Sequence, residues 1–390
     1  MKQRVVIANK FYYKRGGDCI YSMNLEKMLS EHGHEVAFFA MDYPENETSS
    51  WSRYFPSEVK FKPGAGMIEA FRRPLGTHEV IKKFSALLDD FKPDVVHLNN
   101  IHTQLSPVIA RIAHGRGIKV VWTLHDFKLL CPRYDCLRGG ETTCHECFDD
   151  KRNVRRHKCM KGSTVASYLA YLEAKKWNRG LLEEITDTFI CPSDFIKRLM
   201  MKGGFSETKL HHLSNSINVD KFDKPEMSRG DYYCYLGRLS EEKGVGYLID
   251  AANRLPYNLK IIGDGPLAAS LREKANGNID FVGYKQWDEI KDIVGHARFA
   301  VIPSVWYENN PLSVIEAFCL GTPVLGSNIG GIPELIKEDT GRLSEPRDVE
   351  SIEKGIAEMW TIDWNYKQIS AEALARFNDE CYYNNLMRLY

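Results

Sequence analysis

Two glutamates eight positions apart mark the stretch "YENNPLSVIEAF", residues 307–318. The pattern predicts a helix that begins at Pro311, with Asn310 as its N-cap and Gly321 just past its end. Glu308 then lies in the loop before the helix, and Glu316 lies in its second turn among apolar residues. Because a buried carboxylate needs a partner, the pair indicates a site with polar or charged partners.

Two cations predict what such a site could bind. In "YLGRLSEEKGVGYLIDAANRL" a strand ends at Gly237 and a helix begins near Gly244, which leaves Arg238 and Lys243 in the turn. A helix N-terminus, a guanidinium and an ammonium together suit a diphosphate. The alternative is that both are solvated surface charges. Glycine turns at 263–266 and 330–331 follow other expected strands of the same domain.

Short apolar runs alternate with helix-length amphipathic segments, which is the pattern of βαβ units and a parallel sheet. Two sets of such runs predict two Rossmann-like, doubly wound α/β domains. The runs are "VVIA" from Val5, "VAFFA" from Val36, "DVVHL" from Asp94, "KVVWTLH" from Lys119 and "TFIC" from Thr188, then "YYCYLG" from Tyr232, "LKIIGDG" from Leu259, "IDFVGY" from Ile279, "FAVIPS" from Phe299 and "TPVLGS" from Thr322.

The break between the two sets is expected at 213–230, which is polar and shows no sustained period. This predicts a first domain at 1–213, a second at 214–365, and a C-terminal helix at 366–390 that packs back on the first domain. Lys plus Arg and Asp plus Glu both number 52, so no nucleic acid is expected as partner. No signal peptide and no apolar run of roughly 20 residues is found, which predicts a cytoplasmic protein, at most peripheral on the inner face of a membrane.

Five motifs of the second half occur together: "GRLSEEKG", "IIGDGP", "FVGY", "PSVWYENNPLSVIEAFCLGTPVLGS" and "GGIPELI". Their order and spacing resemble the family-4 retaining glycosyltransferases of the GT-B fold, over most of residues 232–345. Glu308 and Glu316 resemble that family's paired glutamates, E-x7-E. The resemblance implies an α/β protein with two Rossmann-like domains that face each other across a cleft.

The resemblance also implies roles in binding a nucleoside-diphosphate sugar. Glu316 would accept hydrogen bonds from the donor ribose, and Glu308 would contact hydroxyls of the transferred sugar. Arg238 and Lys243 would hold the diphosphate. The backbone at positions 283 and 284 would frame the base. Besides Gly283 and Tyr284 at these two positions, the motifs imply Asn310, Pro311 and Leu312 as donor-binding residues.

The first domain carries matching pieces. "YYKRGGDCIYSMNLEKMLSEHGHEV" resembles the family's first glycine-rich loop and helix, which makes Gly16 and Gly17 the backbone that approaches donor and acceptor. "WTLHDF" places His125 just past a strand end, where the family has a histidine near the reacting sugar. "HLNNIH" adds His97 and His102. His97 ends an apolar strand, so it is as well explained as a hydrogen-bonded core residue.

The implied activity is retaining transfer of a sugar to a glycan or polyprenyl-linked acceptor, in bacterial surface polysaccharide synthesis. The implied catalytic residues are Glu308, His125, Arg238 and Lys243. Because no D-x-D stretch occurs, protein cations rather than a metal are expected to stabilise the departing diphosphate, and no cofactor is expected. The alternatives are a sugar-nucleotide epimerase or phosphorylase of related fold, and a non-catalytic nucleic-acid-binding module. A nicotinamide enzyme is disfavoured because G-x-G-x-x-G is absent.

A cysteine-rich basic segment spans residues 131–161. Its thiols could close a structural zinc site or stay free, and both alternatives remain open. The run "KRNVRRHKCMK" from Lys151, followed by Tyr168, Tyr171 and Trp177, could be a solvated face or could rest on anionic lipid. The candidate zinc ligands are Cys131, Cys136, Cys144, Cys147, Cys159 and His157.

Overall fold

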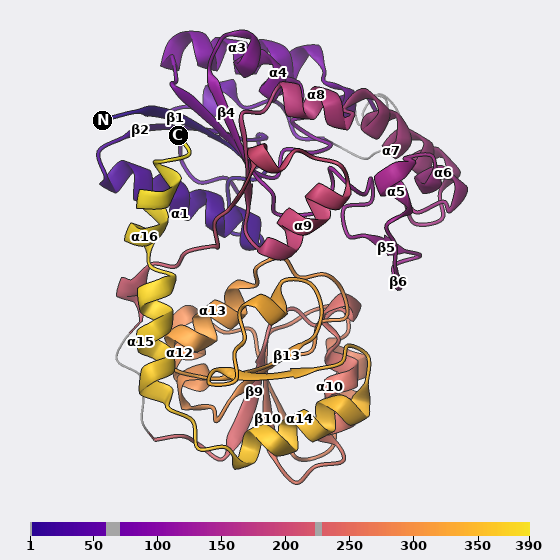
Figure 1. Cartoon of the computed structure of the whole chain (residues 1–390), viewed down its shortest axis with the longest axis vertical. Coiled ribbons are helices and arrows are strands. Elements are labelled where there is room, and N and C mark those ends of the chain that lie inside the picture. Colours follow the sequence, from indigo (N-terminus) through magenta and orange to yellow (C-terminus); the bar gives the residue numbers. More distant parts are fainter. Residues whose placement is uncertain (1, 60–70, 223–227) are drawn as a thin grey trace. The chain divides into compact units, whose positions relative to one another are not determined.

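The computed structural model describes residues 2–59, 71–222 and 228–390, so part of the expected 213–230 break lies outside the described residues. The chain divides into two compact units, each built on a six-stranded sheet (Figure 1). The first unit comprises Met1–Leu213 and Tyr383–Tyr390, and the second comprises Ser214–Tyr382. Among the described residues, no helix combines the length and apolar character needed to cross a membrane.

The sheet of the first unit is parallel throughout, in the order β2-β1-β3-β4-β7-β8. Figure 1 shows α1 on one side of the strands and α3 and α4 on the other. The five expected runs all form strands; β8 was missed because "LHH" is short and mostly polar. The elements are β1 (Arg4–Ala8), α1 (Gly17–Glu31), β2 (Glu35–Phe39), α3 (His78–Phe91), β3 (Val95–Leu98), α4 (Val108–Gly115), β4 (Lys119–Thr123), β7 (Thr188–Cys191), α9 (Asp194–Lys202) and β8 (Leu210–His212).

The sheet of the second unit is also parallel, in the order β11-β10-β9-β12-β13-β14. Its five expected runs form strands, and β14 was missed because "GRLS" contains no apolar run. The elements are β9 (Tyr232–Leu236), α10 (Val245–Ala252), β10 (Asn258–Ile262), α11 (Ala268–Lys274), β11 (Ile279–Gly283), α12 (Trp287–His296), β12 (Ala300–Ile302), α13 (Leu312–Cys319), β13 (Val324–Ser327), β14 (Gly341–Ser344) and α14 (Val349–Thr361).

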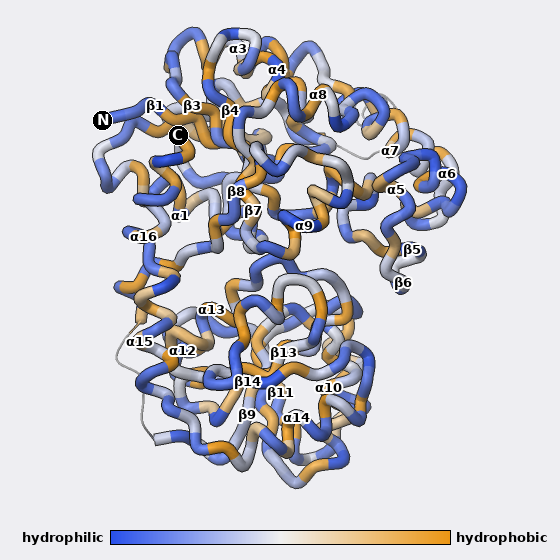
Figure 2. Tube along the Cα trace, in the orientation of Figure 1, coloured by the Kyte–Doolittle hydropathy of each residue, from blue (hydrophilic) through white to orange (hydrophobic). Residues whose placement is uncertain are grey.

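Each unit has its core around the strands, where the hydropathy colouring of Figure 2 turns orange. Val5, Val6 and Ile7 of β1 are fully buried, as are Tyr233 and Cys234 of β9. Parallel strands are covered by helices on both faces, which explains why these strands read as continuous apolar runs rather than as alternating ones. Burial of both faces leaves only the strand ends for polar chemistry.

The chain reverses its direction of winding once in each sheet. In the first sheet the reversal lies between β1 and β3, and in the second it lies between β9 and β12. The loops that leave neighbouring strands at such a switch point turn away from each other and leave a crevice at the carboxyl edge. Ligand-binding side chains are therefore expected in the loops after these four strands.

The cysteine-rich segment adds small elements to the first unit. A hairpin of β5 (Leu137–Arg138) and β6 (Thr142–Thr143) precedes α5 (Glu146–Asp149) and α6 (Asn153–Arg156). Helix α7 (Thr164–Lys176) packs on α6, and α8 (Arg179–Glu184) leads to β7. The hairpin, α5 and α6 are each too short to show a period in the sequence that would predict them.

Residues 366–390 form two helices, α15 (Tyr366–Arg376) and α16 (Asp379–Leu386). Helix α15 packs on α13 in the second unit, where Oγ of Ser370 donates to the carbonyl of Cys319 at 2.7 Å. Beyond Tyr382 the chain belongs to the first unit. There the hydroxyl of Tyr383 lies 2.9 Å from Nε2 of His34.

Candidate active site

The turn after β9 carries the two predicted phosphate-binding cations. Gly244, at the start of α10, has φ 69°, and a Cβ at this position would lie 2.0 Å from the carbonyl oxygen of Pro303. Only glycine therefore lets the turn lie so close to the loop after β12. The amide of Val305 donates to the carbonyl of Glu242 at 3.0 Å, which joins the two loops directly.

This contact brings Lys243 to Glu308. Nζ of Lys243 lies 2.7 Å from Oε1 of Glu308, and the same oxygen accepts hydrogen bonds from Oγ of Ser304 at 2.8 Å and Nε1 of Trp306 at 3.0 Å. Burial raises the pKa of Glu308, but the Lys243 ammonium and these three hydrogen bonds outweigh it and hold the pKa below its ordinary value. Glu308 is therefore an ionised carboxylate at neutral pH.

The predicted glycine turn after β13 supports the backbone of Glu308. The amide of Gly331 donates to the carbonyl of Glu308 at 2.7 Å. Gly330 has φ 66°, and a Cβ there would lie 2.4 Å from the same carbonyl oxygen. Loops from three neighbouring strands, β9, β12 and β13, thus converge on this one glutamate.

Glu316 has different surroundings. It lies in the second turn of α13, and no hydrogen bond or ion pair of its carboxylate is found within residues 2–59, 71–222 and 228–390. Burial raises its pKa to about 7, with Lys221 as the one opposing charge. The two glutamates therefore differ in kind: Glu308 is paired within the protein, whereas Glu316 still lacks the partner that its burial demands.

The start of α13 corrects one prediction. Pro311, expected as the first helical residue, is the N-cap, and the helix begins at Leu312. Asn310 does not cap the helix because its side chain and carbonyl are both bonded to Asn215, at 3.0 and 2.9 Å. Proline has no N–H that would need a partner at this position.

The other predicted donor residues lie at the same edge of the second sheet. Arg238 directly follows Gly237 and its side chain is exposed. Gly283 ends β11 with φ 76°, and Tyr284 is 73% exposed. The structure thus brings Lys243 and Glu308 into contact, and it leaves Arg238 and Tyr284 open to solvent.

In the first unit, His125 follows β4. Its Nε2 lies 2.9 Å from Oδ1 of Asn99, and its ring packs edge-on against Tyr21 at 4.7 Å. Burial lowers the pKa of His125 to about 4, against the opposing charge of Asp18. The imidazole is therefore neutral at physiological pH and available for hydrogen bonding rather than as a cation.

His97 is a core residue, as one of its two interpretations had it. Nδ1 lies 2.6 Å from the hydroxyl of Tyr390 and Nε2 lies 2.7 Å from Oγ1 of Thr123. Both ring nitrogens are thus used within the first unit, and the side chain is fully buried.

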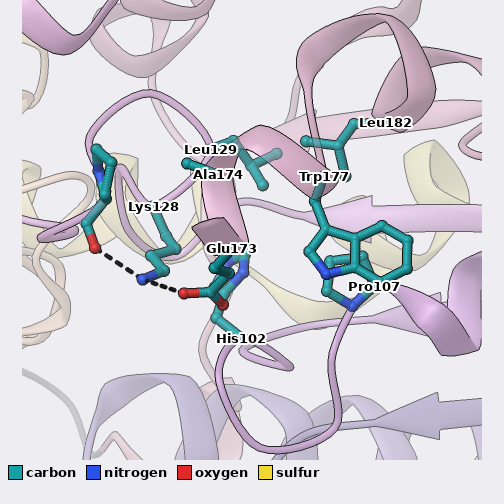
Figure 3. A pocket seen from close by; sticks show the side chains of 9 residues that line it. His102, Pro107, Lys128, Leu129, Glu173, Ala174, Trp177 and Leu182 are labelled. Atoms are coloured by element: carbon teal, nitrogen blue, oxygen red, sulfur yellow. Dashed lines mark hydrogen bonds and ion pairs between the residues drawn. The ribbon is translucent and has the colours of Figure 1, made fainter. Parts of the chain in front are cut away.

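His102 lines a small pocket in the first unit (Figure 3). Beside it Nζ of Lys128 contacts Oε2 of Glu173 at 2.9 Å, and Trp177 closes the apolar side. The cavity volume is ≈ 20 Å³. This is room for about one ordered water molecule beside His102.

Gly16 is the N-cap of α1, and Gly17 is its first residue, with nothing within 4 Å of a Cβ added there.

Polar residues that sequence reasoning missed lie around this loop, at the switch point of the first sheet. Asn100 accepts from Nζ of Lys10 and donates to Oδ2 of Asp18, both at 3.1 Å. Their signal is a polar side chain just after a buried strand or at the start of a helix. In the second unit Ser304, two residues after β12, carries the same signal.

The cysteine-rich segment holds the candidate zinc ligands. Within the described part of the chain, no three His, Cys, Asp or Glu side chains are grouped so as to hold a metal. His157 turns to Oε2 of Glu146, at 2.7 Å. A hydrogen bond from the thiol of Cys136 lowers the pKa of Cys131 to about 7, and the same contact raises the pKa of Cys136. All ten cysteines of the chain are free thiols.

Comparison with known proteins agrees with this geometry. Residues 16–221 match the model of Glycosyltransferase Family 4, and residues 216–376 match that of glycosyl transferases group 1. A 42.6 kDa protein in the cps region of Klebsiella pneumoniae is 25% identical over 371 residues, covering 89% of this chain and 92% of that protein. The O-antigen chain mannosyltransferase B of Escherichia coli is 25% identical over 274 residues, covering 66% of this chain and 65% of that protein.

The fold is shared with solved structures. The Anabaena protein Alr3699/HepE, crystallised in complex with UDP, superposes with a TM-score of 0.69 at 16% identity and covers 100% of this chain and 99% of its own. Structural similarity at this level of sequence identity shows the GT-B fold and nothing more. Because one family model matches more than half of the sequence, the resemblance seen in the motifs is confirmed: the chain belongs to glycosyltransferase family 4 and is a glycosyltransferase with the GT-B fold.

Proposed function

We propose that this glycosyltransferase transfers a sugar, with retention of configuration and without a metal, from a nucleoside-diphosphate sugar to a glycan or polyprenyl-linked acceptor in surface polysaccharide synthesis. The observation that carries the proposal is the contact of Lys243 with Glu308 at the switch point of the second sheet. It joins a cation suited to phosphate to a carboxylate suited to hydroxyls, at the place where such sheets bind ligands.

The diphosphate is assigned to Lys243, Arg238 and the backbone at the start of α10. Lys243 is half-buried and Arg238 is exposed, so both can approach an anion without first leaving a core. A cation 4 Å from a phosphate charge contributes about 4 kcal/mol at an effective dielectric near 20. Such cations stabilise the charge that develops on the departing diphosphate, which is the role a divalent metal would otherwise fill.

The sugar and the ribose are assigned to the two glutamates. Glu308 is ionised and has one oxygen, Oε2, without a hydrogen bond to any described residue, so it can accept from hydroxyls of the transferred sugar. Glu316 has no hydrogen bond or ion pair to any residue that the structure describes, and the two hydroxyls of a ribose would supply a partner. Gly283, Tyr284, Asn310, Pro311 and Leu312 are assigned to the same donor through the family motif.

For the reaction itself we assign no covalent intermediate. Both carboxylates have a binding task, and attack of the acceptor on the face from which the diphosphate departs gives retention without a nucleophile. His125, which is neutral and hydrogen-bonded to Asn99, is assigned to hydroxyls of the reacting sugar. Gly16 and Gly17 are assigned as the backbone that approaches donor and acceptor. Rescue of Glu308→Ala by azide with inversion of configuration would count against this scheme.

The names of similar proteins support the substrate classes. UDP in the Anabaena structure supports a nucleoside-diphosphate donor, and an O-antigen mannosyltransferase supports a glycan acceptor. The first unit also carries an exposed basic and aromatic surface: Arg155 lies 5.1 Å from the rings of Tyr168 and Tyr171, and Tyr168 is 46% exposed. Peripheral contact with anionic lipid is therefore part of the proposal. Equal pelleting with neutral and anionic liposomes would remove that part.

The deciding experiment is calorimetric titration of the wild type and of Glu316→Ala with UDP, GDP and ADP. Selective binding of one nucleotide, weakened by the substitution, supports the donor site and names the base. The matching nucleotide sugar is then incubated with and without a lipid-linked glycan acceptor. Release of the nucleoside diphosphate only when the acceptor is present supports transfer. Formation of an epimerised donor without acceptor contradicts the proposed function, and so does a protein that binds none of the nucleotides.

A further inference from the structure

Three hydrogen-bond donors meet on a single oxygen of Glu308. Two of them, Oγ of Ser304 and Nε1 of Trp306, come from the loop between β12 and α13, and the third is Nζ of Lys243 from the turn after β9. The three distances lie between 2.7 and 3.0 Å. Donors on three sides of one oxygen fix both the position and the plane of a carboxylate.

Trp306 is the member of this group that touches both charges. Its indole N–H donates to Oε1 of Glu308, and the ammonium of Lys243 lies 5.6 Å from the centre of its ring. That distance is within the range of a cation–π contact. One side chain therefore holds the anion through its edge and the cation through its face.

The other oxygen of Glu308 is left for a ligand. Oε2 has no hydrogen bond to the described residues, and the side chain as a whole is 12% exposed. With Oε1 held from three sides, rotation of the carboxylate is restricted. Oε2 therefore has one main orientation before the ligand binds. Because the carboxylate is already ordered, less conformational entropy is lost when a ligand hydroxyl binds to it.

We propose that Trp306 is a positioning residue of the donor site: its indole holds the Glu308 carboxylate and the Lys243 ammonium as one rigid pair, with Oε2 of Glu308 presented to the hydroxyls of the transferred sugar. The inference rests on the proposed function, because it takes Glu308 and Lys243 as donor contacts. Ser304, which is buried, supplies the second fixed donor.

The substitution that tests this is Trp306→Phe, which keeps a six-membered aromatic ring for Lys243 and removes the N–H together with the five-membered ring that carries it. We expect the affinity for the free nucleoside diphosphate to stay within about twofold of the wild type, because the cations are unchanged, while kcat falls about tenfold. The acidic limb of the kcat profile should also move to higher pH, because the ionised form of Glu308 loses a donor. Ser304→Ala should act in the same direction.

Trp364→Phe is the matched control. This tryptophan is buried in the same unit, and its N–H donates to the carbonyl of Met359 at 3.2 Å. It should leave kcat and its acidic limb unchanged. A Trp306→Phe enzyme with wild-type kcat and an unmoved acidic limb overturns the inference. A wild type that binds no nucleoside diphosphate overturns the proposed function instead, so the two failures are told apart.

Discussion

Nζ of Lys243 lies 2.7 Å from Oε1 of Glu308, although the two residues are 65 positions apart and are assigned to different parts of the donor. In the proposed function Lys243 binds the diphosphate and Glu308 binds the sugar, and the bond of the donor that breaks lies between these two groups. On that proposal the two members of the ion pair contact the donor on either side of the reacting bond. Its geometry depends on the adjacency of β9 and β12 in the sheet.

Replacing Lys243 by Met should weaken binding of the nucleoside diphosphate by about 30- to 100-fold, because a charge-assisted contact worth roughly 2–3 kcal/mol is lost. It should also raise the pKa of Glu308, since burial then acts with less opposition. Calorimetry at pH 7 measures the first effect. The control is Lys274→Met, which removes a surface ion pair with Asp250 in the same unit and should not change affinity.

Glu316→Gln should remove a pH dependence of stability. The folded-state pKa of about 7 lies above the ordinary value of 4.5, so the folded protein holds this proton more tightly than the unfolded chain does. The contribution is fully present below pH 4.5 and is lost as the pH rises through 7, by up to about 3 kcal/mol.

Urea unfolding at pH 5, 6 and 8 measures this slope in the wild type and in the variant. We expect the two proteins to be similar at pH 5 and the Gln variant to be the more stable at pH 8, while its affinity for the nucleotide is reduced. Parallel stability curves for the two proteins would show that Glu316 titrates normally.

Asn99→Asp should make His125 titrate in the physiological range. The substitution places a carboxylate against Nε2 of an imidazole whose pKa is now about 4, and a neighbouring anion raises the pKa of histidine by about one to three units. NMR of the ring nitrogens checks this: the wild-type resonances should stay constant above pH 6, and those of the variant should shift between pH 5 and 8. Identical titration curves would mean that Asn99 does not hold the ring in solution.

Gly244→Ala should destabilise the second unit by more than about 2 kcal/mol, because the added Cβ meets the carbonyl of Pro303 and the residue has positive φ. It should also displace Lys243 and weaken nucleotide binding. Gly277→Ala is the control, since nothing lies within 4 Å of its added Cβ. Equal melting temperatures for the two variants would contradict the close contact of the two loops.

Much of the architecture follows from local sequence. The runs at Val5 and Tyr233 form central strands because β-branched and aromatic residues buried on both faces leave an apolar signature that tertiary contacts do not alter. Strands β8 and β14, at the sheet edges, escape prediction because they need less apolar surface. The end of β9, just before Gly237, and the start of α10 are also local features. A glycine ends the strand, and the helical period of the following apolar residues shows where the helix begins.

The two sheets, the family, the loops of Arg238, Lys243 and Glu308 and the helix of Glu316 can all be predicted from the sequence. Three features are visible only in the folded protein: Lys243, Ser304 and Trp306 share one oxygen of Glu308, Glu316 has no hydrogen bond or ion pair to a described residue, and His97 is a core residue bonded to Tyr390. The reason is physical. Strand and helix formation depend on neighbours within a few residues, whereas hydrogen-bond partners and pKa shifts depend on which loops the strand order places together.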